Sequence, residues 1–369
     1  MNWMLGLVGL ALVTVAILDV LWTTLSTTGG GPLSSGLARR LWQGALGLHA
    51  RLSAPSASRL LQGAGPAILL SSLLLWIVLL WTGWTLIFSA APDAVRAVQT
   101  DAPAAPAGRI YFTGYTLFTL GIGNYVPAAG GWEIATAVAS LNGLFLVTLS
   151  ITYLVSVLAA ATRKQRLAAV IAGLGRTPHD ILRRMQAGKE LADDRTYLSQ
   201  LVPMIEMHTR SHLAYPVLHY FHSPDRRAAV SLRLAALDDA LLLMRHGLAE
   251  SARPREATLA PAREAIGALL STLHRTYIDP ATQAPPTPSL GPLQGAGLPV
   301  TDDAAYRRAA DTAAPRRRLM RAYVEDDGWT WADVETDGET TEPARAMTTP
   351  PPRGAPSQAS PSVDRPDSD

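Results

Sequence analysis

One stretch of the chain has an unusual composition for a functional site: TLFTLGIGNYVP, residues 116–127. It holds two glycines around one isoleucine and no charged side chain. Its chemistry must therefore come from backbone groups and hydroxyls. Glycine lets a carbonyl point in directions that residues with a Cβ resist. Gly121 and Gly123, close to the Thr119 hydroxyl, are therefore suited to lining a cavity.

Nucleotide-binding interpretations of the glycine pairs fail on spacing. A dinucleotide fingerprint needs a third glycine three residues further on, between a strand and a helix. Val126 occupies that position here, and Pro178 occupies it after the glycines at 173 and 175. Thr177 followed by Pro178 instead predicts the start of a helix.

Four histidines form a second candidate site. His208 and His212 are four residues apart, and His219 and His222 are three apart, spacings that can place metal ligands on one helix face. However, Pro216 separates the pairs, and the His-Glu-x-x-His pattern of zinc proteases is absent. The pattern favours structural histidines, leaves a pH or metal sensor open, and gives no support to an enzyme site.

Composition limits the classes of function. The chain has 369 residues, of which 48% are hydrophobic and 17% charged, values that suit a protein part membrane-embedded and part soluble. A net charge of +2 is too small to indicate nucleic-acid binding. The absence of cysteine excludes disulfides and thiolate metal sites.

Three segments are long and apolar enough to cross a bilayer, which needs about 20 residues of helix. They are Trp3 to Leu25, Leu60 to Pro92 and Ile134 to Thr162. The leader MNW lacks the positive charge of a signal peptide. The lone charge of the first span, Asp19, is a functional candidate by default, with an interfacial or helix-capping position as the alternative.

Basic residues predict the orientation. Arginines lie between the first two spans, and a basic run follows the third at Arg163, Lys164 and Arg166. The positive-inside rule therefore places residues 26–59 and everything after 163 in the cytoplasm, with the N-terminus and residues 93–133 outside. No span carries arginines at every third position, so a voltage sensor of that type is not expected.

The segment from Ile110 to Trp132 is uncharged but interrupted by glycines and Pro127. A re-entrant loop fits it better than a fourth span, with a short helix over about 110–118 and an extended return. Irregular backbone at membrane depth persists only where protein buries it or it lines a wet cavity.

This pattern resembles potassium channels with one pore loop per subunit, whose filter reads Thr-Val-Gly-Tyr-Gly-Asp. Residues 119–124 here read Thr-Leu-Gly-Ile-Gly-Asn. The family's aromatic pair before the filter corresponds to Tyr111 and Phe112, and its hinge glycine in the inner helix to Gly143. The resemblance covers roughly residues 66–162.

The resemblance implies a specific ion chemistry. Backbone carbonyls of the filter, together with a threonine hydroxyl, would replace the hydration shell of a permeant K⁺ or Na⁺. The ion-binding residues it implies are Thr119, Leu120, Gly121, Ile122 and Gly123. Tyr111, Phe112 and Asn124 would support the filter, and Gly143 would serve as gating hinge or packing site. One subunit supplies one strand, so the family implies a homotetramer.

Two departures from the family affect selectivity. Ile122 stands where a tyrosine hydroxyl normally bonds to the pore helix, and Asn124 replaces an aspartate. Potassium selectivity is the first interpretation, and a weakly selective cation pore is the second. A non-conducting membrane anchor or receptor for the cytoplasmic part is the third.

The remaining sequence divides by pattern. Residues 1–25 are the first span, 26–59 a connection with an amphipathic helix near 37–52, and 60–162 the pore domain. Apolar spacing predicts a helical cytoplasmic domain over 163–278. A Pro-rich linker at 279–299, a helical extension at 300–336 with Trp329 and Trp331 as anchors, and a disordered tail at 337–369 follow.

Taken together, the sequence predicts an all-α membrane protein of the cell membrane with three spans, a re-entrant pore loop and a helical cytoplasmic domain. The expected partners are the lipid bilayer, three further copies of the chain, and a ligand or protein of unknown identity at the cytoplasmic domain. No cofactor, resident metal, enzyme activity or nucleic-acid partner is expected.

Overall fold

The computed structural model describes residues 2–27, 29–52, 54–187, 190–191 and 195–336. Within these, three helices are long and apolar enough to cross a membrane: α1 (Trp3–Leu25), α3 (Ala54–Ser89) and α5 (Gly131–Leu174). The predicted tail at 337–369 lies outside the described residues.

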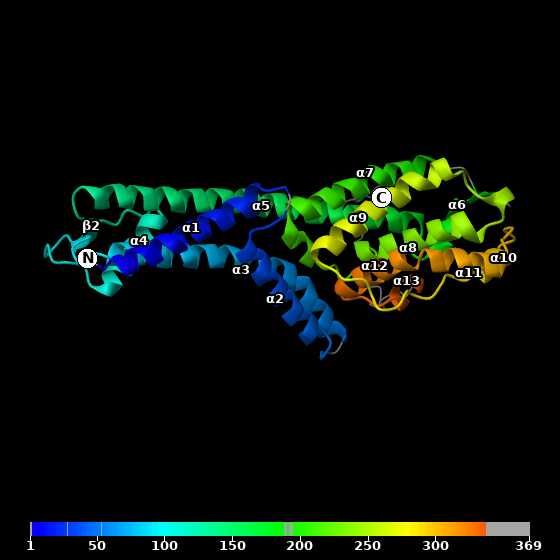
Figure 1. Ribbon diagram of the computed structural model, residues 1–369, viewed down its shortest axis with the longest axis horizontal. Coiled ribbons are helices and arrows are strands. Elements are labelled where there is room, and N and C mark those ends of the chain that lie inside the picture. The colour runs from blue at the N-terminus through cyan, green and yellow to red at the C-terminus, as the bar shows by residue number, and fades with distance from the viewer. Residues whose placement is uncertain (1, 28, 53, 188–189, 192–194, 337–369) are drawn as a thin grey trace, which may run out of the picture. The chain divides into compact units, whose positions relative to one another are not determined.

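The three long helices run side by side, and the short helix α4 (Pro106–Leu117) lies between them at one end (Figure 1). Large apolar side chains remain exposed along each of them, including Leu10, Leu74 and Phe145. Such surfaces need lipid or a partner chain to cover them. Their exposure therefore agrees with the prediction of a membrane-embedded bundle.

Helix α1 packs against α3 through glycines. A Cβ on Gly9 would lie 2.9 Å from the backbone nitrogen of Ile87, and a Cβ on Gly83 would lie 2.8 Å from Cγ2 of Val13. Small residues allow this approach, which is how helices in membranes gain contact where lipid is as apolar as the side chains.

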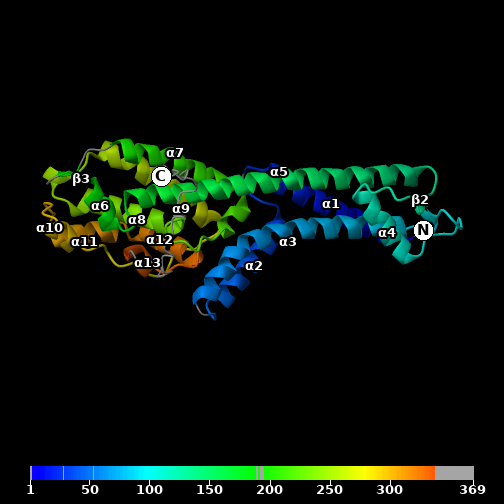
Figure 2. The ribbon, with the colours of Figure 1, turned by 180° about the vertical axis from the view of Figure 1, so that it is seen from behind.

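Helix α2 (Pro32–His49) forms an antiparallel pair with the first turns of α3, as Figure 2 shows from behind. The amphipathic helix expected near 37–52 therefore exists, but it begins earlier because Pro32 provides a favourable first position. Likewise, α4 begins at Pro106 rather than near 110.

Two short antiparallel sheets were not expected from the sequence. Strand β1 (Val95–Ala97) pairs with β2 (Tyr125–Pro127), with Arg96 opposite Val126. Strand β3 (Gln186–Ala187) pairs with β4 (Glu190–Leu191). Two or three residues are too few to produce a readable alternation of polar and apolar side chains.

After its membrane-length portion, α5 continues without a break into the helical domain, where it packs against α7 and α8. The elements of this domain are α6 (Pro178–Met185), α7 (Arg195–Ala214), the 3₁₀ turn η1 (Pro216–Tyr220), α8 (Val230–Leu242), the π turn η2 (Leu243–Gly247), the 3₁₀ turn η3 (Glu250–Ala252), α9 (Glu256–Thr276), α10 (Gly291–Gly295), α11 (Asp303–Thr312), α12 (Ala314–Asp326) and α13 (Ala332–Glu335).

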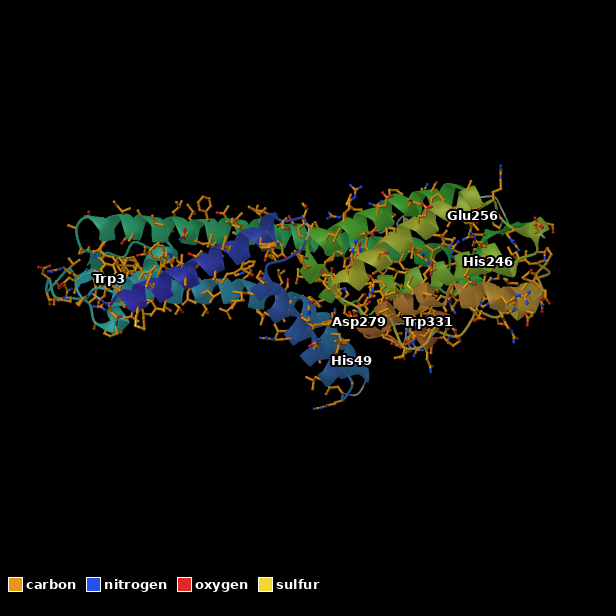
Figure 3. All side chains as sticks on the ribbon, in the orientation of Figure 1. Trp3, His49, His246, Glu256, Asp279 and Trp331 are labelled. Carbon is orange, nitrogen blue, oxygen red and sulfur yellow. The ribbon has the colours of Figure 1, made fainter. Side chains whose placement is uncertain are left out.

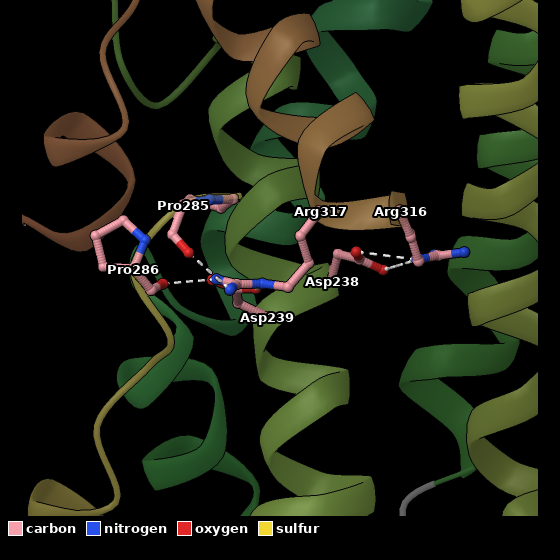
Figure 4. A network of polar contacts seen from close by, with 6 residues as sticks. All are labelled: Asp238, Asp239, Pro285, Pro286, Arg316 and Arg317. Carbon is pink, nitrogen blue, oxygen red and sulfur yellow. Dashed lines mark hydrogen bonds and ion pairs between the residues drawn. The ribbon is translucent and has the colours of Figure 1, made fainter. Parts of the chain in front are cut away.

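Helix α8 is the centre of this domain, and each of its residues is buried. Two of them are acids, and α12 supplies their partners (Figure 4). The guanidinium of Arg317 forms two 3.0 Å hydrogen bonds to Asp239, and Arg316 donates to Asp238 at 2.6 Å. Arg317 also donates to the Pro285 carbonyl. The clamp joins α8, α12 and the Pro-rich segment.

The 300–336 region docks on the same core. Trp331, labelled in Figure 3, is 7% exposed, and the Arg317 guanidinium lies 5.8 Å from the centre of its ring. Trp329 packs at the edge of the core beside His222. Both tryptophans therefore pack as apolar side chains in or against the core of the helical domain.

Candidate functional site

The predicted ion-binding residues lie on an irregular loop between α4 and β2. Leu120 is 65% exposed and Ile122 47% exposed in the single chain. In the described chain, the amides of Gly121, Ile122 and Gly123 form no hydrogen bond to protein. The loop is thus bare backbone whose polar groups are free to meet a ligand.

The sign of φ alternates along this loop. Thr119, Gly121 and Gly123 have φ of 56°, 58° and 82°, whereas Leu120 and Ile122 do not have positive φ. Alternating hands turn successive N–H groups toward one side, and in trans peptides the carbonyls point the opposite way. A row of carbonyls on one side is the arrangement that binding a dehydrated cation needs.

Thr119 is notable because a β-branched residue rarely adopts the left-handed conformation. Its amide donates to the Thr116 carbonyl at 3.1 Å, and the Leu120 amide donates to the Tyr115 carbonyl at 2.8 Å. These bonds use carbonyls that the end of α4 leaves without helical partners. The end of the helix therefore fixes the start of the loop.

The far end of the loop is held by the β1–β2 sheet. The Val98 amide donates to the Asn124 carbonyl at 3.1 Å, and the Ala128 amide donates to the Ala94 carbonyl at 3.0 Å. Asn124 thus supports the loop through its backbone. The segment after α3 therefore restrains the outgoing strand.

Aromatic rings pack behind the loop. Phe112 is 1% exposed, and its ring centre lies 5.1 Å from Phe88 and 5.4 Å from Tyr115. Tyr111 is 42% exposed and lies 5.3 Å from Tyr115. Both members of the predicted aromatic pair therefore belong to this cluster.

Tyr115 and Tyr125 also belong to the site, although the sequence pattern did not predict them. The Tyr115 hydroxyl donates to the backbone carbonyl of Tyr125, just beyond the loop. This bond joins α4 to the strand leaving the loop, a role that Ile122 lacks the hydroxyl to fill. The signal available was an aromatic residue one helical turn after Tyr111, on the same face of the pore helix.

Trp81 of α3 positions α4 from the other side. Its indole N–H donates to the Ile110 carbonyl at 2.9 Å, and its ring occupies the space where Gly114 has no side chain. Arg109 adds a 2.8 Å bond to the Pro92 carbonyl. The first half of α4 and its Gly114 are therefore held by the preceding span and the segment that follows that span.

A hollow of about 480 Å³ opens beside the loop. The loop residues Thr119, Gly121 and Gly123 line one side, and Glu133 and Thr136 at the start of α5 line another. The Glu133 carboxylate accepts from the Gly130 amide and so caps α5.

Gly143 lies where α5 passes the end of α4. A Cβ at this position would overlap the carbonyl oxygen of Leu117. Because the obstacle is backbone, no change of rotamer relieves it. Close packing is therefore a sufficient reason for glycine here, and the hinge role stays a prediction.

Asp19 does not face the loop. It is 2% exposed and accepts hydrogen bonds from the Leu33 amide at 2.8 Å and the Trp76 indole at 2.8 Å, as well as from both Ser34 donors. The Asp19 carboxylate of α1 thus caps the N-terminus of α2 and also bonds to α3 through the Trp76 indole. This is the helix-capping alternative for Asp19.

The four histidines gather in the helical domain. The rings of His208 and His212 are 4.4 Å apart, His219 stacks on Tyr277 at 4.1 Å, and His219 Nε2 lies 2.6 Å from Asp326. Among the described residues, no group of three or more acidic or histidine side chains could hold a metal ion.

Burial governs the protonation of two of these histidines. It lowers the pKa of His208 to about 3, with the positive charge of Lys164 acting in the same direction. Burial, with His208 nearby, holds the pKa of His212 well below its usual range. Both imidazoles are therefore neutral at pH 7, as packed structural histidines are.

The two spans and the loop between them coincide with a segment that matches a family of ion channels. Residues 73–160, which run from within α3 through the loop to α5, match the family described as "Ion channel". The chain therefore carries an ion-channel domain.

One relative matches most of the chain. It is 35% identical over 324 residues to the uncharacterized membrane protein YdjJ of Bacillus subtilis (strain 168), covering 88% of this chain and 94% of that protein. The chain belongs to the same family as YdjJ. No solved structure matches it.

Proposed function

We propose that four copies of this chain form a channel that conducts potassium passively through the backbone carbonyls of Thr119, Leu120, Gly121 and Ile122, with the Thr119 hydroxyl. The observation that carries the proposal is the alternation of φ along a loop whose amides have no partner in the described chain. The exposed apolar face of α5, with Leu144, Phe145 and Ile151, supports burial against neighbouring subunits.

The end of α4 adds an electrostatic reason for a cation. Helix carbonyls at a C-terminus carry a partial negative charge of about half an elementary charge. The C-terminus of α4 is also where the loop begins, at Leu117. Four such helix ends around one axis would favour a cation at the centre of the assembly.

The proposed orientation places the N-terminus and the loop outside, and the helical domain in the cytoplasm. It rests on the arginines between α1 and α3 and on the basic run after Thr162. An accessibility assay with single cysteines at Ala129 and Gly44 tests it, because the chain has no native cysteine. Impermeant reagent added outside should label only the former.

The conducting experiment is the reversal potential of purified protein in a planar bilayer, with potassium on one side and sodium on the other. A reversal tens of millivolts toward the potassium potential is the expected result. A reversal near zero with robust current would instead establish a weakly selective cation pore. The absence of a hydroxyl on Ile122 is the observation that favours this second function.

Gly121→Ala separates a channel from a non-conducting anchor. Gly121 has φ of 58° with open space around the position, so an added methyl strains the backbone without a clash. Conductance should fall at least tenfold while expression and oligomeric state stay unchanged. Gly63→Ala, at another open position but inside α3, is the matched control. Monomeric protein in mild detergent would contradict the pore.

A further inference from the structure

A cavity of about 290 Å³ opens where the membrane helices meet the helical domain. It is bounded by the end of α1, by α2, α3 and α5, and by η1 and the end of α9. Its polar lining includes Ser35, Arg39, Ser72, Tyr153, Tyr220 and Tyr277. None of the lining residues is acidic.

Several of these polar groups have no protein partner. Arg39 is an exposed residue that lines the cavity, and it forms no ion pair in the described chain. The side chains of Tyr153 and Tyr220 are 4% and 5% exposed and line the cavity. Among the described residues neither hydroxyl has a hydrogen bond, and neither is one of the enclosed polar atoms, so both are open to the cavity. Two hydroxyl donors and an unpaired guanidinium that line one cavity are able to bind an acceptor from outside the chain.

The acids near the cavity are already engaged. Asp19 is satisfied by the cap of α2 and the Trp76 indole, and Asp326 pairs with His219 at 2.6 Å. Burial raises the pKa values of the Tyr220 and Tyr277 hydroxyls, and the positive charge of Arg39 lowers them. Burial still raises the pKa of Tyr220 to about 12, so its hydroxyl keeps its proton and can donate.

The cavity lies at the depth of lipid headgroups. Tyr153 is 19 residues after Ile134, about 29 Å along α5, which is the thickness of the hydrocarbon core. Helix α1 also ends here, at Leu25. Leu69, Val217 and Ala38 give the cavity an apolar wall beside its polar one.

We propose that this cavity binds the phosphate group of an anionic phospholipid, with the Arg39 guanidinium and the Tyr153 and Tyr220 hydroxyls as donors. Arginine meets phosphate oxygens with two parallel hydrogen bonds, the strongest of the common polar contacts. The apolar wall accommodates the glycerol end of the acyl chains. Because the cavity is shared by the spans and η1, the bound headgroup stabilises their junction.

The test is binding of dioctanoyl phosphatidylglycerol to the purified full-length protein in a neutral detergent. Trp42, whose ring lies 5.6 Å from Tyr220, gives a fluorescence signal near the site. Binding should be saturable and should raise the unfolding temperature by mass action. Arg39→Gln should weaken it about tenfold, the loss of roughly one charged hydrogen-bonded pair.

Arg40→Gln is the matched control, because Arg40 is an exposed arginine of α2 like Arg39 but does not line the cavity. Its affinity should equal that of the wild type. Tyr220→Phe removes one hydroxyl and should weaken binding about threefold to tenfold. An unchanged unfolding temperature without lipid shows that each variant is folded. Equal affinities of the Arg39 and Arg40 variants would overturn the proposal.

Two further ligands identify the source of the phosphate. Zwitterionic dioctanoyl phosphatidylcholine should bind about tenfold more weakly than the anionic lipid, since its choline charge offsets the phosphate. Glycerol 3-phosphate binding with the lipid's affinity would overturn the lipid assignment in favour of a soluble phosphate. These measurements do not use conductance, so their failure leaves the channel proposal separately testable.

Discussion

Gly143 shows how one residue can have two explanations that an experiment separates. If packing against the Leu117 carbonyl is the reason for glycine, Gly143→Ala displaces the end of α4 and lowers conductance. Adding Asn142→Gly restores backbone freedom but leaves the clash. The double variant should therefore stay as impaired as the single one in bilayer recordings.

A hinge role would give the opposite result for the double variant. Glycine in a helix interior costs about 1 kcal/mol relative to alanine and loosens the backbone, so moving it by one residue should restore opening. Recovery of more than half the wild-type conductance would thus contradict the packing explanation.

Asp19 is the second prediction at the scale of single residues. Asp19→Ala leaves the Leu33 amide and the Trp76 indole buried without their acceptor, at a cost of about 1–3 kcal/mol each. The unfolding temperature of the protein in detergent should fall by several degrees. Asp303→Ala, which removes an exposed ion pair with Arg307, should change it little. Equal effects would show that the buried cap does not stabilise the bundle.

At the scale of elements, the crossing of α1 and α3 depends on the absence of side chains. Gly83→Leu would push its side chain into Val13 and the Gly9 backbone, so the two helices must separate. Overpacking of this kind costs about 1–3 kcal/mol, often more when backbone is the obstacle. We expect a lower unfolding temperature of the protein in detergent.

The control for this crossing is Gly36→Leu, because a side chain at Gly36 on α2 meets no atom within 4 Å. It adds the same volume at an open position and should leave stability within about 0.5 kcal/mol. A stable Gly83→Leu protein would mean that α1 is not fixed against α3 by this contact.

The helical domain is linked to the membrane part by charge as well as by the continuous α5. Lys164 of α5 is 5% exposed and donates to the Phe221 carbonyl at 2.8 Å. Asp327 accepts a hydrogen bond from the Ser231 hydroxyl at 2.5 Å. Burial alone would raise the pKa of the Asp327 carboxyl, but the charge of Lys164 and the hydrogen bond to His222 lower it. These buried contacts therefore join α5 to α8 and to the C-terminal helices.

At the scale of the whole molecule, pH should change stability in a predictable direction. The pKa values of His208 and His212 are lowered by folding, so the unfolded chain binds more protons below pH 6.5 and stability falls on acidification. Asp239 opposes this, because burial raises its pKa to about 6 and the folded state then binds its proton first.

The magnitudes decide the sign. Between about pH 6.5 and 5, protonation of each histidine in the unfolded chain lowers the free energy of unfolding by the equivalent of about 1.5 pK units. Protonation of Asp239 in the folded chain raises it by about one unit. At about 1.4 kcal/mol per unit, the free energy of unfolding therefore falls by roughly 3 kcal/mol. The unfolding midpoint in urea should therefore be lower at pH 5 than at pH 7.5. His212→Gln should reduce this difference by about three quarters, because the remaining histidine is then largely offset by Asp239. His179→Gln, at a half-buried position in α6, should preserve the difference. A pH-independent midpoint would contradict the assignment.

Much of the membrane architecture was predictable from local pattern. Uninterrupted apolar runs fix the three long helices, because a helix is the way a single segment satisfies its backbone in lipid. Bounds were less predictable: α4 and α2 begin several residues earlier than periodicity indicates, at Pro106 and Pro32. The loop itself was identified because its glycines interrupt an otherwise apolar stretch.

What the sequence determined by itself is thus the set of spans, the position of the bare loop, and the predominance of helix, since each depends on residues adjacent in the chain. The tertiary structure decided which distant groups meet: Tyr115 with the Tyr125 carbonyl, Asp19 with α2 and Trp76, and Arg39 with the tyrosines of one cavity. These contacts depend on how helices cross and at what depth. That is set by close packing of glycines and aromatic rings, which no local periodicity encodes.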